Sequence, residues 1–296
     1  MGVNLAPASS PSCENFASFD SPRGPVKVVI LGGGTIARLV LEHVHRGELP
    51  EVEVVAIAAR GFASRAAALA AEYRVPCVAD AGAFLALKPD VLLEAASHDA
   101  VRDHLVATLA AGVSVIVLSA GALADDRLRA EAEAAAARSG ALLYVPSGGI
   151  GGLDALKGAC AAGVETVSIQ VAKPPAAWKG IPYVDSLGVD LDRLPEATTL
   201  FEGPAREGVP HFPQNVNIAA VLSLAGIGFD RTRLQVVADP ALTRNTHTIR
   251  VSGRSGRFTM VLENVPAPDN PKTAWLACYS AIAALRALSG SARYGT

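Results

Sequence analysis

Long apolar segments and an excess of charge of either sign are both missing from this sequence of 296 residues. Half of its residues are hydrophobic, yet no run approaches the roughly 20 residues that a membrane-spanning helix needs. The 26 basic and 28 acidic residues give a net charge of −2 and are scattered, which argues against a nucleic-acid or membrane surface. Aromatic residues make up only 5%, whereas Ala, Val, Leu and Gly dominate, as expected of a parallel sheet covered by helices.

Cysteine is also scarce in this chain. The four cysteines lie far apart and form no Cys-x-x-Cys pair, so we predict reduced structural thiols in a cytoplasmic protein, not a metal site or a disulfide framework. The Ser- and Pro-rich residues 1–24 lack the apolar core of a signal peptide, and we expect a mobile tail there.

A glycine-rich turn is the most informative feature that is present. The apolar, β-rich run 26–31 leads directly into the pattern Gly-x-Gly-x-x-Ala, and a helical pattern follows at once. The first glycine permits a tight turn, the second lets the backbone approach a pyrophosphate, and the alanine keeps the helix close to the strand. Free N–H groups at the helix N-terminus would bind the anion. The predicted nicotinamide-cofactor contacts in this turn are Gly32, Gly34, Thr35, Ile36 and Ala37.

Up to about residue 147, short β-rich runs alternate with alanine-rich helical patterns, which is typical of right-handed βαβ units around a parallel sheet. We expect strands at 26–31, 52–58, 75–78, 91–95, 113–118 and 141–145, and helices at 36–45, 62–73, 100–111 and 124–138. Pro76 confines the third strand to a sheet edge, as in a complete dinucleotide-binding domain. The sequence therefore predicts an α/β fold that begins with a doubly wound Rossmann domain over residues 25–147.

The pattern changes after a glycine-dense segment at 147–152. A helix to about residue 162 is followed by runs with a period of two residues. We expect strands at 166–172, 235–238, 246–251 and 258–263, and helices at 216–224 and 273–288. Such runs with few crossovers predict a C-terminal α+β domain of mixed sheet over residues 148–296, with a final helix at about 270–289 that is able to pack back on the first domain.

The choice of cofactor is usually made at the end of the second strand, where a carboxylate binds the 2′-hydroxyl of NAD. This sequence has no carboxylate there and offers Arg60, a good partner for the 2′-phosphate of NADP. We expect NADP to be accepted at least as well as NAD, the alternative being that Arg60 is a solvated loop charge. Ser97 and Ala120, at the ends of the fourth and fifth strands, leave room for ribose and nicotinamide. His98 is either a catalytic residue or a structural one. In the second case it caps the next helix or lies on the rim of the site.

The second half carries polar residues in ordered surroundings. Asn215 is expected to cap a helix, so Asn217 needs another role, such as binding a carboxamide or the substrate. His247 begins a strand-like alternation and suits proton transfer near neutral pH, with a purely structural histidine as the alternative. Lys272 is expected in the first turn of the final helix, where the dipole disfavours cations, and a ligand or a structural partner would explain its presence there.

Several short motifs follow one another along the chain. They are Gly-x-Gly-x-x-Ala at 32–37, Glu-Ala-Ala-Ser-His at 94–98, Ser-Gly-Gly-Ile-Gly-Gly-Leu-Asp at 147–154, Lys-Pro-Pro at 173–175, Phe-Glu-Gly-Pro-Ala-Arg at 201–206, Phe-Pro-Gln-Asn-Val-Asn at 212–217, Asp-Pro to Asn-Thr-His at 239–247 and Asn-Pro-Lys-Thr at 270–273. Together, from residue 26 to about residue 289, they resemble the L-aspartate dehydrogenase family. The resemblance implies a homodimer that interconverts L-aspartate with oxaloacetate and ammonium, using NAD or NADP.

The resemblance also implies roles for single residues. His247 matches the active-site histidine and Asn217 a cofactor contact, while Gly149 stands where the family usually has an alanine that touches the cofactor. The substrate carboxylates need cations or donors, for which the candidates are Lys173, His211, Arg244 and Lys272. Two other interpretations stay open: an oxidoreductase of the homoserine dehydrogenase or dihydrodipicolinate reductase type, and a non-catalytic NAD(P)-binding sensor.

Overall fold

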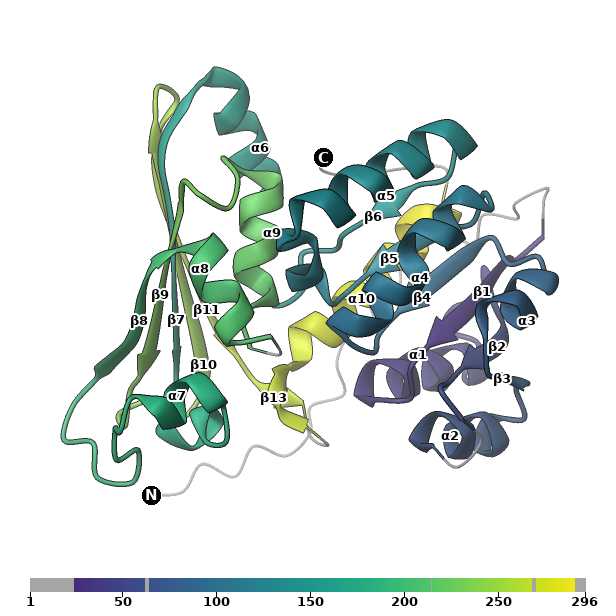
Figure 1. The fold of residues 1–296 in the computed structure, drawn as a ribbon, viewed down its shortest axis with the longest axis horizontal. Coiled ribbons are helices and arrows are strands. Elements are labelled where there is room, and N and C mark those ends of the chain that lie inside the picture. The colour runs from purple at the N-terminus through teal and green to yellow at the C-terminus, as the bar shows by residue number, and fades with distance from the viewer. Residues whose placement is uncertain (1–23, 62–63, 214, 268–269, 291–296) are drawn as a thin grey trace.

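The computed structural model describes residues 24–61, 64–213, 215–267 and 270–290, which form two lobes (Figure 1). The expected tail, apart from Gly24, lies outside the described residues. The first lobe contains β1 (Val26–Leu31), α1 (Thr35–His45), β2 (Val52–Ala58), α2 (Arg65–Tyr73), β3 (Cys77–Val78), α3 (Ala81–Ala86), β4 (Val91–Glu94), α4 (His98–Ala110), β5 (Ser114–Val117), η1 (Ala120–Ala124), α5 (Asp126–Ser139) and β6 (Leu143–Tyr144).

Six parallel strands form the sheet of the first lobe, in the order β3-β2-β1-β4-β5-β6. Val28 of β1 lies opposite Val54 of β2 on one side and Val91 of β4 on the other. The strand order reverses between β1 and β4, and in this order the dinucleotide lies beyond the carboxyl ends of the strands at that point. The predicted Rossmann sheet is confirmed, including the place of the third strand at the edge.

Both faces of this sheet are covered by helices because its strands are apolar on both sides. Val28 and Ile30 share a buried cluster with α1, α2 and the C-terminal helix α10 (Trp275–Ser289), which contributes Ile282. Val29 and Leu31 pack with α3, α4 and α5 on the other face. The last helix of the chain thus completes the core of the first lobe.

The second lobe is built on a mixed sheet with the order β11-β10-β7-β9-β8, as the predicted fold class requires. Only β7 and β9 run parallel within it. Helices α6, α8 and α9 lie on the face turned towards the first lobe, and no helix covers the opposite face within the described residues (Figure 1). The elements are α6 (Leu153–Ala162), β7 (Val164–Lys173), η2 (Pro175–Trp178), α7 (Pro182–Ser186), β8 (Thr198–Pro204), α8 (Ala205–His211), α9 (Asn217–Ala225), β9 (Thr232–Ala238), β10 (Asn245–Gly253), β11 (Gly256–Asn264), β12 (Pro266–Ala267) and β13 (Asn270–Ala274).

Two expectations about helix starts are wrong. The final helix does not include Lys272, because Asn270–Ala274 pairs with β12 as an antiparallel strand and the helix begins only at Trp275. Asn215 does not cap α9, whose N-cap is Val216 without a side-chain cap. The side chain of Asn215 instead accepts a hydrogen bond from Lys173.

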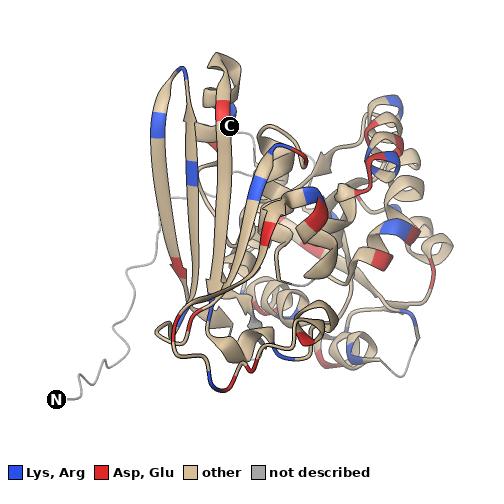
Figure 2. Ribbon diagram, turned by 60° about the vertical axis from the view of Figure 1, so that its left-hand side comes forward, with Lys and Arg blue, Asp and Glu red and all other residues tan. Residues whose placement is uncertain are grey.

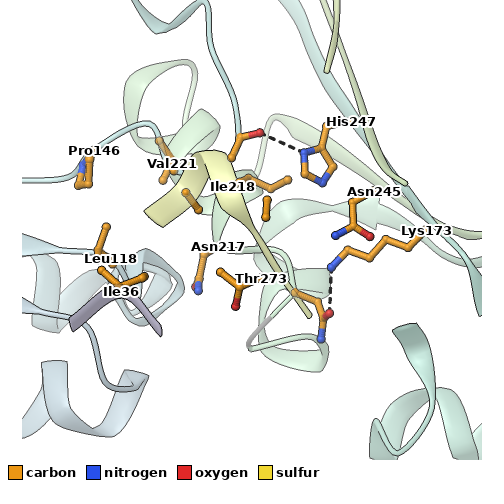
Figure 3. A pocket seen from close by; sticks show the side chains of 15 residues that line it. Ile36, Leu118, Pro146, Lys173, Asn217, Ile218, Val221, Asn245, His247 and Thr273 are labelled. Carbon is orange, nitrogen blue, oxygen red and sulfur yellow. Dashed lines mark hydrogen bonds between the residues drawn. The ribbon is translucent and has the colours of Figure 1, made fainter. Parts of the chain in front are cut away.

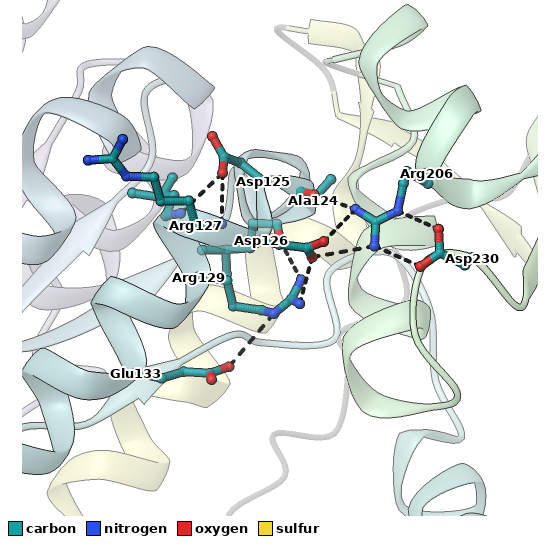
Figure 4. A network of polar contacts seen from close by, with 10 residues as sticks. Ala124, Asp125, Asp126, Arg127, Arg129, Glu133, Arg206 and Asp230 are labelled. Carbon is teal, nitrogen blue, oxygen red and sulfur yellow. Dashed lines mark hydrogen bonds and ion pairs between the residues drawn. The ribbon is translucent and has the colours of Figure 1, made fainter.

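An arginine side chain joins the two lobes (Figure 4). Arg206, in α8, donates from Nη1 to the carbonyl of Ala124 at 3.0 Å and pairs with Asp126 at 3.2 Å, both in the first lobe. Its other nitrogens form a bidentate pair with Asp230 of the second lobe. This one side chain therefore holds α8 against the start of α5.

Charged residues of both signs are interspersed over the two lobes (Figure 2). None of the helices that the structure describes combines the length and the apolar composition needed to cross a bilayer.

Candidate active site

A cavity of about 110 Å³ lies between the two lobes. Ile36 and Leu118 line it from the first lobe, and His247, Asn245 and Lys173 face them from the second (Figure 3). Its polar lining consists of Lys173, Asn215, Asn217, Asn245, His247 and Thr273. The cavity therefore has an apolar wall beside the Rossmann sheet and a polar wall opposite.

The glycine turn has the form that a pyrophosphate requires. Gly32 has a φ of +114°, and a Cβ on it would lie 2.6 Å from the carbonyl oxygen of Ala95. Gly34 has open space where its Cβ would be, and as the N-cap of α1 it leaves the first N–H groups of the helix without a side-chain cap. Thr35 begins α1 and Ala37 is fully buried. This turn fits the phosphates of a dinucleotide, because the helix start has no side-chain cap and the N-cap glycine leaves open space beside it.

The close approach of α2 to the turn explains why a glycine also stands at position 33. A Cβ on Gly33 would lie 2.2 Å from Cα of Ala66 at the start of α2. Only glycine therefore lets the start of α2 pack against the turn, a requirement that the sequence pattern alone does not reveal.

His247 lies in the polar wall and is only 3% exposed. Its Nδ1 is 3.2 Å from the carbonyl oxygen of Gly149, while Nε2 is buried and has no hydrogen-bond partner among the described residues. Burial, aided by the charge of Lys173, lowers the pKa of His247 to about 4. The imidazole is thus neutral at physiological pH, and a buried nitrogen without a partner is expected where a ligand completes the site.

Two groups lie next to Nδ1 of His247, and they favour opposite tautomers. A carbonyl oxygen only accepts, so the contact with Gly149 is a hydrogen bond only when Nδ1 carries the proton, which leaves the lone pair on Nε2. Nδ2 of Asn264, at the end of β11, lies 3.1 Å from Nδ1, and that contact is a hydrogen bond only when Nδ1 carries no proton. The same Nδ2 donates to the carbonyl oxygen of Gly149 at 2.9 Å, so Asn264 contacts both the histidine and the carbonyl beside it.

Lys173 ends β7 in the same wall and is 2% exposed. It donates from Nζ to Oδ1 of Asn215 at 3.0 Å (Figure 3), and its ammonium lies 5.0 Å from the centre of the Trp178 ring. A buried ammonium ion beside a cavity is well placed to bind a carboxylate.

The remaining predicted cofactor residues lie at the carboxyl edge of the first sheet but do not line the cavity. Arg60 is exposed just beyond the end of β2. Ser97 is the N-cap of α4, where its Oγ accepts from the N–H of Ala100 at 3.2 Å. Ala120 is fully buried at the start of η1.

Two of the predicted carboxylate-binding residues, His211 and Arg244, do not line the cavity, and the prediction for Lys272 is not tested. His211 is exposed on α8 and stacks on Tyr183 with ring centres 4.1 Å apart. Arg244 is exposed in the turn before β10. Lys272 is part of β13, and its side chain lies outside the described structure.

A buried carboxylate organises the strand ends beside the cavity. Glu94, 1% exposed, accepts hydrogen bonds at 2.8–3.0 Å from the N–H groups of Ala96, Ser97 and Ser119 and from the hydroxyl of Ser119. Burial raises the pKa of Glu94, and these hydrogen bonds act in the opposite direction. All of its partners are donors, which is the pattern that suits an ionised carboxylate.

Comparison with known proteins yields close relatives. Residues 154–288 match the family model for the C-terminal part of aspartate dehydrogenase, and residues 32–146 match that for the NAD-binding domain of homoserine dehydrogenase. L-Aspartate dehydrogenase from Methanocella arvoryzae is 40% identical over 273 residues, which are 91% of this chain and 99% of that protein. L-Aspartate dehydrogenase from Methanosarcina acetivorans is 48% identical over 207 residues, which are 70% of this chain and 76% of that protein.

A solved structure agrees with these matches. The crystal structure of aspartate dehydrogenase from Thermotoga maritima has a TM-score of 0.72 and 28% identity, and the match covers 91% of this chain and 99% of that one. The homoserine dehydrogenase model matches only the first half of the chain, whereas the second half, which contributes His247, matches the other model.

Proposed function

Since this chain belongs to the L-aspartate dehydrogenase family, we propose that it catalyses the reversible oxidative deamination of L-aspartate to oxaloacetate and ammonium with a nicotinamide cofactor. The observation that carries the proposal is the buried imidazole of His247, which lines the cavity between the two lobes and whose Nε2 has no hydrogen-bond partner in the described part of the chain. The test is loss of NADH or NADPH absorbance when purified protein is mixed with oxaloacetate and ammonium. Cofactor binding without any turnover would favour a sensor instead.

In this proposal each residue around the cavity has a separate role in binding or in proton transfer. The bound nicotinamide supplies the acceptor for the hydride that leaves C2 of aspartate. His247 accepts a proton at Nε2 from the water that adds to C2 of the resulting imine, and it returns the proton as ammonia leaves. The hydrogen bond to the carbonyl of Gly149 favours the tautomer that this role needs. The proposed cofactor-binding residues, in addition to Arg60, are Gly32, Gly34, Thr35, Ile36, Ala37, Ser97, Ala120, Gly149 and Asn217.

Lys173 is the proposed partner of a substrate carboxylate. The variant Lys173→Met is expected to raise KM for L-aspartate and oxaloacetate about 10- to 100-fold, the value of one charge-assisted hydrogen bond. The positive charge of Lys173 also lowers the pKa of His247, so its removal raises that pKa and moves the acid limb of kcat/KM to higher pH. Steady-state kinetics from pH 4 to 9 measure both effects. An unchanged KM and an unchanged acid limb would exclude the role.

Arg60 is the proposed ligand of the 2′-phosphate, so that NADP is accepted at least as well as NAD. We expect Arg60→Ala to weaken NADPH binding about 10-fold and to leave NADH binding unchanged, because only NADPH carries the phosphate. Fluorescence titration with both coenzymes measures the difference. Arg46→Ala is the matched control, since Arg46 follows the opposite end of α1. An equal loss of affinity for NADPH and NADH would exclude Arg60 as the ligand of the 2′-phosphate.

We also propose that the protein is a homodimer in the cytoplasm. No described helix covers the outer face of the second sheet, and this supports self-association, because an open sheet face is commonly buried by a partner (Figure 1). The mass in solution tests this.

A further inference from the structure

Three groups from the two lobes meet at one oxygen atom. Oδ1 of Asn217, the first residue of α9, lies 2.9 Å from Nε2 of His98, the first residue of α4. The same oxygen accepts a hydrogen bond from the N–H of Gly121, in η1, at 3.0 Å. His98 and Gly121 belong to the first lobe, whereas Asn217 belongs to the second and lines the cavity.

The direction of these hydrogen bonds determines how the amide of Asn217 is turned. A carbonyl oxygen only accepts, so His98 must carry a proton on Nε2 and donate it. An amide without such partners turns over easily and exchanges its oxygen and nitrogen. Here both donors favour the same orientation, in which neither His98 nor Gly121 occupies the hydrogens of Nδ2. The neighbours on the first lobe therefore decide what Asn217 offers to a ligand.

The packing around Oδ1 of Asn217 leaves no room for a side chain at position 121. A Cβ on Gly121 would lie 2.5 Å from Cε1 of His98 and 2.9 Å from Oδ1 of Asn217. Burial lowers the pKa of His98, Arg102 lowers it further, and the hydrogen bond to Asn217 and the charge of Asp99 act the other way. A neutral His98 has a single proton, and Asn217 holds that proton on Nε2.

We propose that His98 is a positioning residue, which turns the amide of Asn217 so that Nδ2 donates to a carbonyl acceptor on the nicotinamide half of the cofactor. Because this hydrogen bond crosses between the lobes, cofactor affinity then depends on how the lobes meet. The inference rests on the proposed function in that Asn217 contacts the cofactor.

A double-mutant cycle on NADH affinity tests this. We expect His98→Leu and Asn217→Ala each to weaken NADH binding about 10-fold, the value of one buried hydrogen bond. The double variant should bind no more weakly than Asn217→Ala, since His98 acts through Asn217. His98→Gln should retain most of the affinity, because its amide nitrogen is able to donate in place of Nε2. Losses that add in the double variant, or full affinity in His98→Leu, would overturn the proposal.

Two further measurements distinguish a positioning role of His98 from a folding defect of the variants and from failure of the proposed function. Thermal unfolding shows whether each variant is folded, and nitrogen NMR of labelled histidine in the cofactor-free protein should find His98 as the Nε2–H tautomer. The Nδ1–H tautomer would contradict the inference. These measurements need no turnover. If the protein proved inactive on aspartate, the proposed function would be refuted, and the double-mutant cycle on NADH affinity would still test the role of His98.

Discussion

Replacing His247 by alanine is expected to lower turnover by roughly 10²- to 10⁴-fold and to leave NADH affinity nearly unchanged. The loss follows from removing the only titratable side chain, among the described ones lining the cavity, that is neutral with an available lone pair at physiological pH. Stopped-flow kinetics and NADH titration measure the two quantities separately. Turnover within a few-fold of the parent protein would exclude an acid–base role.

The same histidine has an effect on stability that serves as an internal check. Its pKa is about 4 in the folded protein and close to 6.5 when unfolded, so between these values the unfolded chain binds more protons. Stability therefore falls as the pH drops from 6.5 to 4, by roughly 3 kcal/mol from this group. Urea unfolding of the parent protein and of His247→Gln over this range should show a loss that is larger in the parent by about this amount, because His98 and the other titrating groups are common to both. Identical pH dependence would mean that the imidazole is not buried as described.

Removing the carboxylate of Glu94 is expected to have the second large effect. Glu94→Ala should lower the free energy of unfolding by about 3 kcal/mol or more, because three N–H groups and a hydroxyl lose their buried acceptor. Urea denaturation measures the loss. Glu72→Ala is the control, because Glu72 forms an exposed pair with Arg38, and such pairs are worth no more than about 1 kcal/mol. Equal losses in the two variants would contradict this account.

The fold was largely predictable because its first half consists of regular, continuous signals. Buried strands such as β1 and β2 read as apolar runs that contain a single charged residue at their second position, and the predicted bounds agree with Val26–Leu31 and Val52–Ala58. The edge strand Thr198–Pro204 was missed, because few of its residues are buried and it becomes a strand only by pairing with β9. The strand Asn270–Ala274 was mistaken for a helix start, because its hairpin pairing with β12 leaves no periodic signal.

The site was predictable only where a residue is unusual for its own element. His247 is a polar residue in a strand of otherwise buried character, and a pattern of that kind is visible in sequence. Asn264 lies 17 residues away and reaches the histidine only through the pairing of β10 with β11. His98 and Asn217 are 119 residues apart, and neither residue type by itself indicates that they meet. Contacts between lobes depend on tertiary packing, which local patterns do not encode.

The return of α10 to the first lobe bears on how the chain matures during synthesis. Ala281, Ile282 and Leu285 belong to the same apolar cluster as β1 and α1, although almost the whole second lobe separates them along the chain. A nascent chain that has emerged only as far as residue 147 has one wall of its nucleotide-binding core missing. The early lobe then remains incomplete until the ribosome has released the final helix, and a product truncated before Trp275 would expose that apolar wall to chaperones and proteases.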